Sequence, residues 1–317
     1  MITKKLEKLE QKTLYNFEKH KLRNLPLYNK YFKFSPKKAE NILECAKSLV
    51  FNLNEHINTK EHKITLQHMY TCKDRFCPFC NWRRQMKYSK MIYKHILELE
   101  ERKKLRYIFL TLTVKNCHIN DLKMTINDMQ KSFNRMSKTV KWKRSILGFL
   151  RVLEFTVQKD DNNMIHPHFH ILLAVEPSYF NPRYNSYLKK EDFSNMWMKA
   201  LRVDYAPVVD VRIVKQNSTQ SKNANASVVA EMSKYPLKDT DIEKIEDFEN
   251  LVKQLKGVKN INAGGIFKGI LSKEKKIDED LIHIDEENRE ELWIVIDTLF
   301  YEFGSRDGKQ KYFSTII

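Results

Sequence analysis

Apolar residues follow two different periods along the middle of the chain. Four short runs are predicted to be strands, because their apolar side chains alternate with others or follow one another without a break. These runs are 107–114, 150–158, 168–175 and 208–214. Between them, residues 122–136 and 193–201 carry apolar side chains three and four positions apart, which is typical of amphipathic helices. The predicted order of elements is therefore βαββαβ.

The flanking regions follow simpler patterns. Residues 1–25 alternate Lys and Glu, which indicates an exposed helix or a mobile arm, and helices are predicted at 40–51 and 82–101. Near the other end, residues 248–255 are expected to be helical and 292–313 to form a hairpin. We divide the chain into an N-terminal helical module (1–100), a βαββαβ core (101–242) and a C-terminal α/β appendage (243–317). The core order is ferredoxin-like, an α+β fold with an antiparallel sheet covered by helices on one face.

Three histidines occupy alternate positions of the third predicted strand, His166, His168 and His170. Alternate side chains of a strand share a face. If the preceding turn is centred near Asn162, Glu154 lies opposite His170 on that face. Two imidazoles and a carboxylate, with open positions for water and a phosphate, suit Mn²⁺ or Mg²⁺ at least as well as Zn²⁺. We predict a metal site formed by His168, His170 and Glu154, with His166 supporting it.

A second candidate lies in the predicted helix of residues 226–239. Glu231 and Tyr235 are four positions apart there and share a helix face, with Lys234 and Lys238 close by. A tyrosine can attack phosphorus when cations stabilise the developing charge. The chain has 14 tyrosines, so this segment alone is weak evidence.

Cysteines provide a third candidate. Cys72, Cys77 and Cys80 have the spacing of a zinc knuckle, and three of the five cysteines fall in it. The candidates for a fourth ligand are His68, which is our first choice, and then His62 and Cys45. The knuckle either contacts DNA or only pins the N-terminal region to the core. In the first case, the contacts are expected from three basic side chains around it: Arg75, Arg83 and Arg84.

Composition agrees with a nucleic-acid partner. The chain has 57 Lys and Arg against 40 Asp and Glu, a net charge of +17, which favours binding to phosphates. The sequence has no apolar run of about 18 residues, as a membrane helix would need, and its first residues are too polar for a secretory signal. We expect a cytoplasmic protein without a membrane partner. The segment 264–269 lacks the Lys-Ser/Thr pair of a phosphate-binding loop, so DNA unwinding is expected to come from a partner.

Taken in order, these motifs resemble a known family. The strand 109–116, then Glu154, then His-Pro-His-Phe-His at 166–170, then Glu231-x3-Tyr235-x2-Lys238 resemble the initiators of rolling-circle plasmid replication. Those initiators are HUH endonucleases, and the likeness is to the subgroup with one catalytic tyrosine and a catalytic glutamate. It covers the chain from about residue 72 to 267. Relaxases place the tyrosine before the histidines, so the order here favours a replication initiator.

The resemblance implies an activity. It is metal-dependent nicking and joining of single-stranded or hairpin DNA at a plasmid origin, in which Tyr235 forms a 5′-phosphotyrosine. Host polymerase would extend the free 3′-hydroxyl, a host helicase would unwind the duplex, and a homo-oligomer is compatible with the sequence. Glu231 would activate the water that ends the cycle, and Lys234 or Lys238 would offset charge on the phosphate. The alternatives are a transposase or mobilisation nuclease of the same chemistry, and a zinc-containing DNA-binding repressor without catalysis.

Overall fold

The computed structural model describes residues 2–158, 160–184, 186–214, 229, 232, 239–270, 277, 279–284 and 292–315. The chain divides into two compact units: Met1–Lys87 with Lys276–Ile317, and Tyr88–Lys275. This division differs from the three consecutive segments expected from the sequence, 1–100, 101–242 and 243–317. The reason is that segments from the two ends of the chain pair in one sheet.

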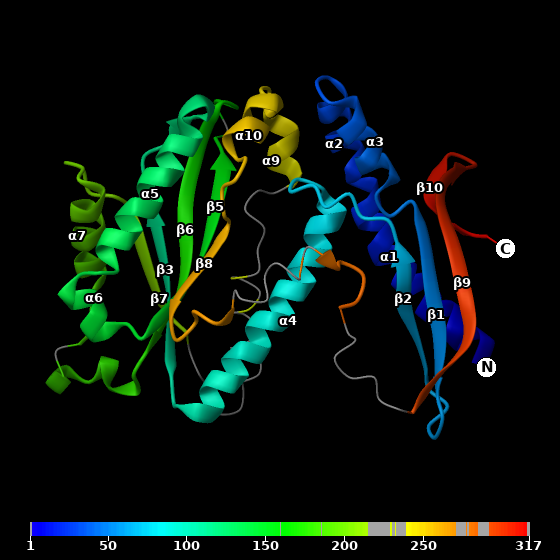
Figure 1. Ribbon diagram of the computed structural model, residues 1–317, viewed down its shortest axis with the longest axis horizontal. Helices are drawn as coiled ribbons and strands as arrows, with labels where there is room; N and C mark the ends of the chain where they lie inside the picture. Colours follow the sequence, from blue (N-terminus) through cyan, green and yellow to red (C-terminus); the bar gives the residue numbers. More distant parts are fainter. Residues whose placement is uncertain are drawn as a thin grey trace. The chain divides into compact units, whose positions relative to one another are not determined.

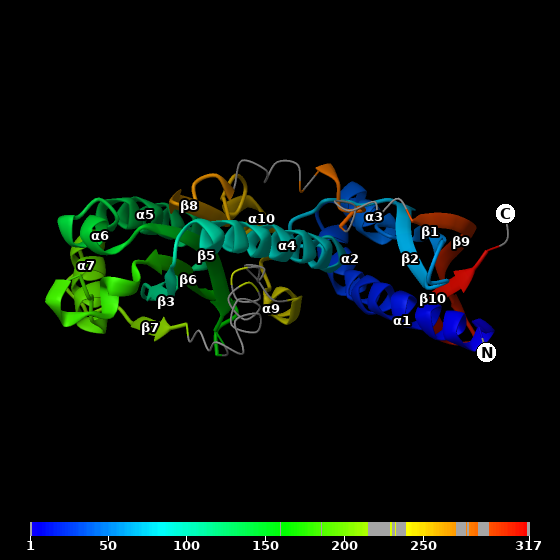
Figure 2. The same ribbon diagram turned by 90° about the horizontal axis from the view of Figure 1, so that it is seen from below.

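The first unit combines helices near the N-terminus with a four-stranded antiparallel sheet. Its helices are α1 (Ile2–Leu22), α2 (Asn24–Phe32) and α3 (Pro36–Glu44), and its strands are β1 (Ser48–His56), β2 (His62–Met69), β9 (Trp293–Arg306) and β10 (Lys309–Ser314). The strand order is β10-β9-β1-β2, and α1 lies along this sheet (Figure 2). The helix expected at 40–51 was wrong in its second half, because it ends at Glu44 and β1 begins at Ser48. The expected C-terminal hairpin is confirmed as β9 and β10.

The second unit is built on a larger antiparallel sheet. Its strands are β3 (Arg106–Thr113), β4 (Cys117–His118), β5 (Gly148–Val157), β6 (Met164–Val175), β7 (Val209–Ile213) and β8 (Ile261–Gly265). The helices are α4 (Pro78–Arg102), which begins in the first unit, then α5 (Leu122–Met136), α6 (Val140–Ser145), α7 (Lys190–Leu201), α9 (Asp239–Lys244) and α10 (Phe248–Gln254), with short 3₁₀ turns at Ile119–Asp121, Pro177–Phe180 and Pro182–Tyr184. The strand order is β7-β3-β6-β5-β8, with β4 paired to β6.

Helices cover both faces of this sheet (Figure 1). On one face, Phe169 of β6 contacts Phe133 of α5 and Trp197 of α7. On the other face, Ile92 and Ile96 of α4 belong to one buried cluster with sheet residues. The expectation of helices on one face was therefore wrong, because the helix assigned to the N-terminal module packs its second half on the sheet.

Among the described residues, the second face carries a buried apolar cluster. The α4 cluster includes Leu172 and Ala174 of β6 and Val152 of β5. His168 and His170 precede Leu172 at alternate positions of the same strand, so they lie on the same face, beyond the apolar cluster.

Candidate functional site

The hairpin of β5 and β6 carries the predicted metal ligands. Glu154 pairs with His168, and Val152 pairs with His170. The sequence-based register, with Glu154 opposite His170, was wrong by two residues, because the turn is centred on Asp161 rather than Asn162. A slip of two keeps every side chain on its face, so the carboxylate still meets the histidines.

The three side chains converge at short range. Glu154 Oε2 lies 2.8 Å from His170 Nε2 and 3.8 Å from His168 Nε2. One ligand atom from each residue lies within 4.8 Å of the others, which is close enough for a shared cation. The side chains keep 11–21% of their surface exposed, so a substrate atom can reach the group.

The remaining ring nitrogens are held by the sheet. His168 Nδ1 lies 3.2 Å from the backbone oxygen of His166 and donates to it, which leaves Nε2 as the nitrogen with a free lone pair. His170 Nδ1 lies 3.2 Å from Thr111 Oγ1 on the neighbouring strand β3. Contacts of this kind fix the orientation of a metal-binding imidazole. Sequence analysis missed Thr111, although it alternates with Thr113 in a strand that pairs with the histidines.

Electrostatics favour an ionised carboxylate. Burial alone would raise the pKa of Glu154, but the adjacent side chains of His168 and His170 outweigh it and hold that pKa well below its ordinary value. An ionised carboxylate oxygen and two imidazole nitrogens are ligand atoms that can bind a divalent cation together.

His166 lies beside this group rather than in it. Its Nδ1 is 2.6 Å from Oδ1 of Asn116, the residue that ends the motif of strand β3. Burial, and then the neighbouring His168, lower the pKa of His166. The supporting role expected for His166 stays a prediction.

The predicted nucleophile segment lies mostly outside the described residues, namely Glu231, Lys234, Tyr235 and Lys238. Val229 and Met232 of that segment are described, and both are buried in the cluster with Val152 and Leu172. That cluster occupies the sheet face that bears His168 and His170.

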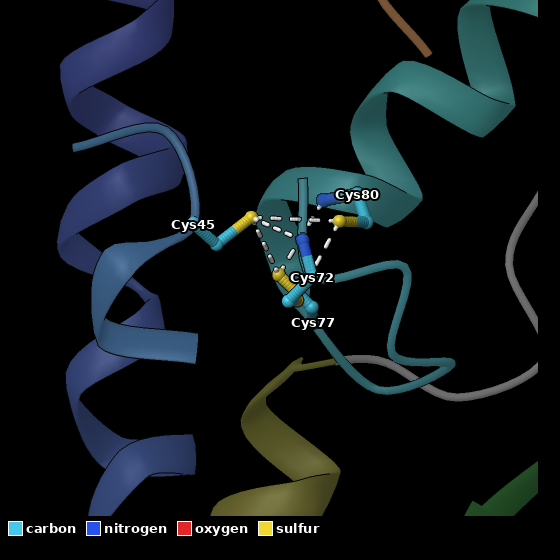
Figure 3. A group of neighbouring side chains, drawn as sticks. All are labelled: Cys45, Cys72, Cys77 and Cys80. Carbon is cyan, nitrogen blue, oxygen red and sulfur yellow. Dashed lines mark hydrogen bonds between the residues drawn. The ribbon is translucent and has the colours of Figure 1, made fainter. Parts of the chain in front are cut away.

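A second group of possible metal ligands belongs to the first unit (Figure 3). It joins Cys72, Cys77 and Cys80, as expected, to Cys45 at the end of α3. The first choice of fourth ligand was wrong. His68 of β2 pairs with Val50 of β1 and is exposed, whereas the next residue, Met69, is buried. Strand alternation thus turns His68 away from the core.

His62, the next candidate, does not belong to the group: its Nε2 lies 3.4 Å from Glu55 Oε2. Arg83 and Arg84 are each 5% exposed, and their guanidinium groups donate to backbone carbonyls. The expectation that these two arginines contact DNA is therefore not supported by their positions. Arg75 is half-buried and stays a prediction.

None of the helices in the described part of the chain has a stretch long and apolar enough to span a bilayer.

Comparison with known proteins identifies the family. Residues 63–313 match the family model Rep_1, described as replication protein. A Protein rep of Streptococcus pneumoniae is 35% identical over 257 residues, covering 79% of this chain and 77% of the relative. The Protein rep of Lactiplantibacillus plantarum is 36% identical, with 80% of each chain covered. That of Lentilactobacillus hilgardii is 31% identical over 94% of each chain.

No solved structure is significantly similar to this chain. The family match spans most of the sequence and includes both candidate metal groups except Cys45. This chain belongs to the replication protein family Rep_1.

Proposed function

We propose that this protein is a rolling-circle plasmid replication initiator that nicks and rejoins one strand of origin DNA at an HUH-type site. The observation that carries the proposal is the convergence of Glu154, His168 and His170 on one sheet face. Family membership supports it, since the relatives are themselves replication proteins.

The sheet supports the proposal through its topology. The elements β3, α5, β5, β6, α7 and β7 follow the βαββαβ order, and their strands are arranged β7-β3-β6-β5. The ferredoxin-like palm expected of an HUH enzyme has this strand order, which supports the proposal. The histidine strand β6 is central, so its ligands have neighbours on both sides that restrict their movement.

The ligand set fits a hard or borderline divalent cation. One carboxylate and two imidazoles leave open positions, which suits Mn²⁺ or Mg²⁺. When bound, such an ion polarises the scissile phosphate. Glu154 supplies the negative charge, and Thr111 and the backbone of His166 orient the imidazoles. The cysteine group would hold Zn²⁺ apart from this chemistry.

Tyr235 is the proposed nucleophile. Its oxygen attacks phosphorus, the 3′ oxygen leaves and takes up a proton, and the 5′ side stays attached to the tyrosine. The support is that Met232, three residues before Tyr235, packs on the histidine face. Lys234 or Lys238 would offset phosphate charge.

Glu231 is the proposed base for termination. One tyrosine is blocked after the first cleavage, so a second cut needs another nucleophile. Glu231 would accept a proton from the water that hydrolyses the second junction. A host polymerase, a host helicase and a homo-oligomer stay predictions about partners.

A nicking assay tests the proposal. Supercoiled plasmid carrying the candidate origin should be relaxed by wild-type protein with Mn²⁺ or Mg²⁺, and not by the His168→Ala/His170→Ala variant. His68→Ala serves as the matched control, because His68 is an exposed strand histidine of the other unit. Origin binding without nicking by folded wild type would favour a repressor instead. Nicking at a transfer or transposon end, and not at an origin, would favour the other HUH enzymes.

A further inference from the structure

The four cysteines of the first unit have the spacing of a tetrathiolate metal site. Cys45 Sγ lies 3.5 Å from Cys80 Sγ and 3.7 Å from Cys77 Sγ, and Cys72 Sγ lies 3.7 Å from Cys80 Sγ. A tetrahedral Zn²⁺ with Zn–S bonds of about 2.3 Å would separate its sulfurs by about 3.8 Å. The group is therefore close to the geometry that the ion imposes.

The surroundings suit thiolates. Cys45, Cys77 and Cys80 are fully buried. Backbone N–H groups point at two of the sulfurs, from Cys72 to Cys45 Sγ and from Cys80 to Cys77 Sγ, each at 3.5 Å. Buried sulfurs that accept backbone hydrogen bonds and lie this close together would repel one another as thiolates unless a cation joined them.

Two buried cations lie beside the group. Lys21 Nζ donates to the carbonyl of Cys45 over 2.7 Å. Arg84 Nη1 donates to Asp74 O at 3.0 Å and Asn81 Oδ1 at 2.8 Å, which holds the loop between Cys72 and Cys77. Four thiolates around one Zn²⁺ carry a net charge of −2, so nearby positive side chains stabilise the complex rather than oppose it.

Segment 279–284 of the C-terminal part is hydrogen-bonded to residues that lie close in sequence to Cys72 and Cys80. Arg83, three residues after Cys80, donates Nε to Leu281 O at 2.8 Å and a second N–H to Ile282 O. Lys73, next to Cys72, donates to Glu279 O at 3.2 Å. The segment 279–284 is thus hydrogen-bonded to residues that lie close in sequence to Cys72 and Cys80.

Strands β9 and β10 of the C-terminal part are hydrogen-bonded to the residues that follow Cys45. Tyr312 of β10 donates its hydroxyl to Ala46 O, and Phe303 of β9 donates its N–H to Lys47 O at 2.8 Å. Ala46 and Lys47 directly follow Cys45. Both attachment regions of the C-terminal part therefore adjoin a cysteine of the group.

We propose that Cys45, Cys72, Cys77 and Cys80 bind one structural Zn²⁺, and that this ion keeps segment 279–284 and strands β9 and β10 docked on the N-terminal part of the first unit. The proposal is independent of the nuclease chemistry, because none of these residues belongs to the second unit.

The ligand set is tested on the full chain. Protein purified under reducing conditions should contain one tightly held zinc. After exchange with cadmium, cadmium NMR on wild type should show an all-sulfur site, distinct from any nitrogen- and oxygen-ligated site at the histidines. Cys45→Ser should lose the zinc, whereas Cys117→Ser, at a cysteine outside the group, and His68→Ala should keep it. Absence of zinc, or a site with three sulfurs and one nitrogen, would overturn the assignment even if Cys45→Ser fails to fold.

The docking role is tested by hydrogen exchange on wild type before and after zinc chelation. Amides of 279–284 and of β10 should exchange about tenfold faster or more without zinc, because the region opens locally. Amides of β3, β5 and β6 should change less than about twofold. Unchanged protection of 279–284 and β10 after complete zinc removal would refute the docking role, and so would equal loss of protection in both units.

Discussion

Thr111→Val is expected to weaken the proposed metal site without replacing any of its ligands. Thr111 stands directly opposite His170 in the β3–β6 pair, and its Oγ1 lies 3.2 Å from His170 Nδ1. Valine has nearly the same shape but cannot hold the imidazole. Loss of such an orienting contact costs about 10–100-fold in metal affinity, or about 1.4–2.8 kcal/mol.

The lower end of that range applies here. The side chain of His170 is 21% exposed, so water can replace part of the lost hydrogen bond. We therefore expect about a tenfold increase in the dissociation constant for Mn²⁺. Isothermal calorimetry measures it directly, and the Mn²⁺ concentration for half-maximal nicking should shift by a similar factor while the rate at saturating Mn²⁺ changes less.

Thr113→Val is the matched control. Thr113 lies two residues further along β3, on the same face and opposite His168, and its hydroxyl donates to Val208 O at 2.8 Å. The control should lower the free energy of unfolding by about 1 kcal/mol, because Val208 O keeps the backbone N–H of Thr113 as a donor. Its Mn²⁺ affinity should stay within about twofold of wild type. Equal Mn²⁺ affinities for Thr111→Val and wild type, or equal weakening in both variants, would refute the orienting role of Thr111.

Three further predictions concern other residues. Tyr235→Phe should abolish the covalent adduct with a suicide oligonucleotide, whereas Glu231→Ala should form an adduct that persists; an undiminished adduct with Tyr235→Phe would place the nucleophile elsewhere. Burial, and then Arg23 and Lys19, lower the pKa of His20 to about 4, and its ring stacks on Trp82 with centroids 4.5 Å apart. The native state keeps His20 neutral where the unfolded chain protonates it, so stability should fall as pH drops from about 6.5 towards 4. His20→Phe should flatten this part of the pH profile in thermal melts, and an unaltered profile would contradict the assignment. Arg83→Ala should lower the free energy of unfolding of the first unit by about 3 kcal/mol, since two charged hydrogen bonds are lost, while DNA affinity at fixed salt changes little. A tenfold loss of DNA affinity at unchanged stability would contradict this.

The convergence of Glu154, His168 and His170 could be predicted from the sequence because its signal is local. Alternation alone puts His168 and His170 on one face, and a hairpin with a short turn brings Glu154 to it. The register was wrong by two residues, since the polar residues 160–163 between the two strands offer several adjacent centres for the turn. Periodicity does not distinguish among them, although each keeps Glu154 on the same face.

Contacts between residues far apart in the sequence could not be decided from local periodicity. Cys45 reaches the knuckle because α3 ends there, and 26 residues, counted as 72 − 45 − 1, separate it from Cys72. Residues 48–51 follow helix α3 directly, and their apolar pattern was read as a continuation of that helix. They belong instead to strand β1, which pairs with distant segments of the chain. The charge of Arg83 and Arg84 is the same whether they bind a DNA phosphate or a backbone carbonyl. Their burial in the structure, which the sequence does not give, favours the carbonyl contacts.

The pairing of β1 with β9 has a consequence for synthesis on the ribosome. Leu49 pairs with Tyr301, a separation of 301 − 49 = 252 residues. The described strands of the sheet that carries the histidines, by contrast, lie between Arg106 and Gly265. That sheet can form while the last strands are still inside the ribosome, whereas β1 must wait for β9 with one edge unpaired. A copy cut short before Trp293 would therefore keep its histidine strand yet leave β1 available to chaperones and proteases, which would favour removal of incomplete copies over their accumulation.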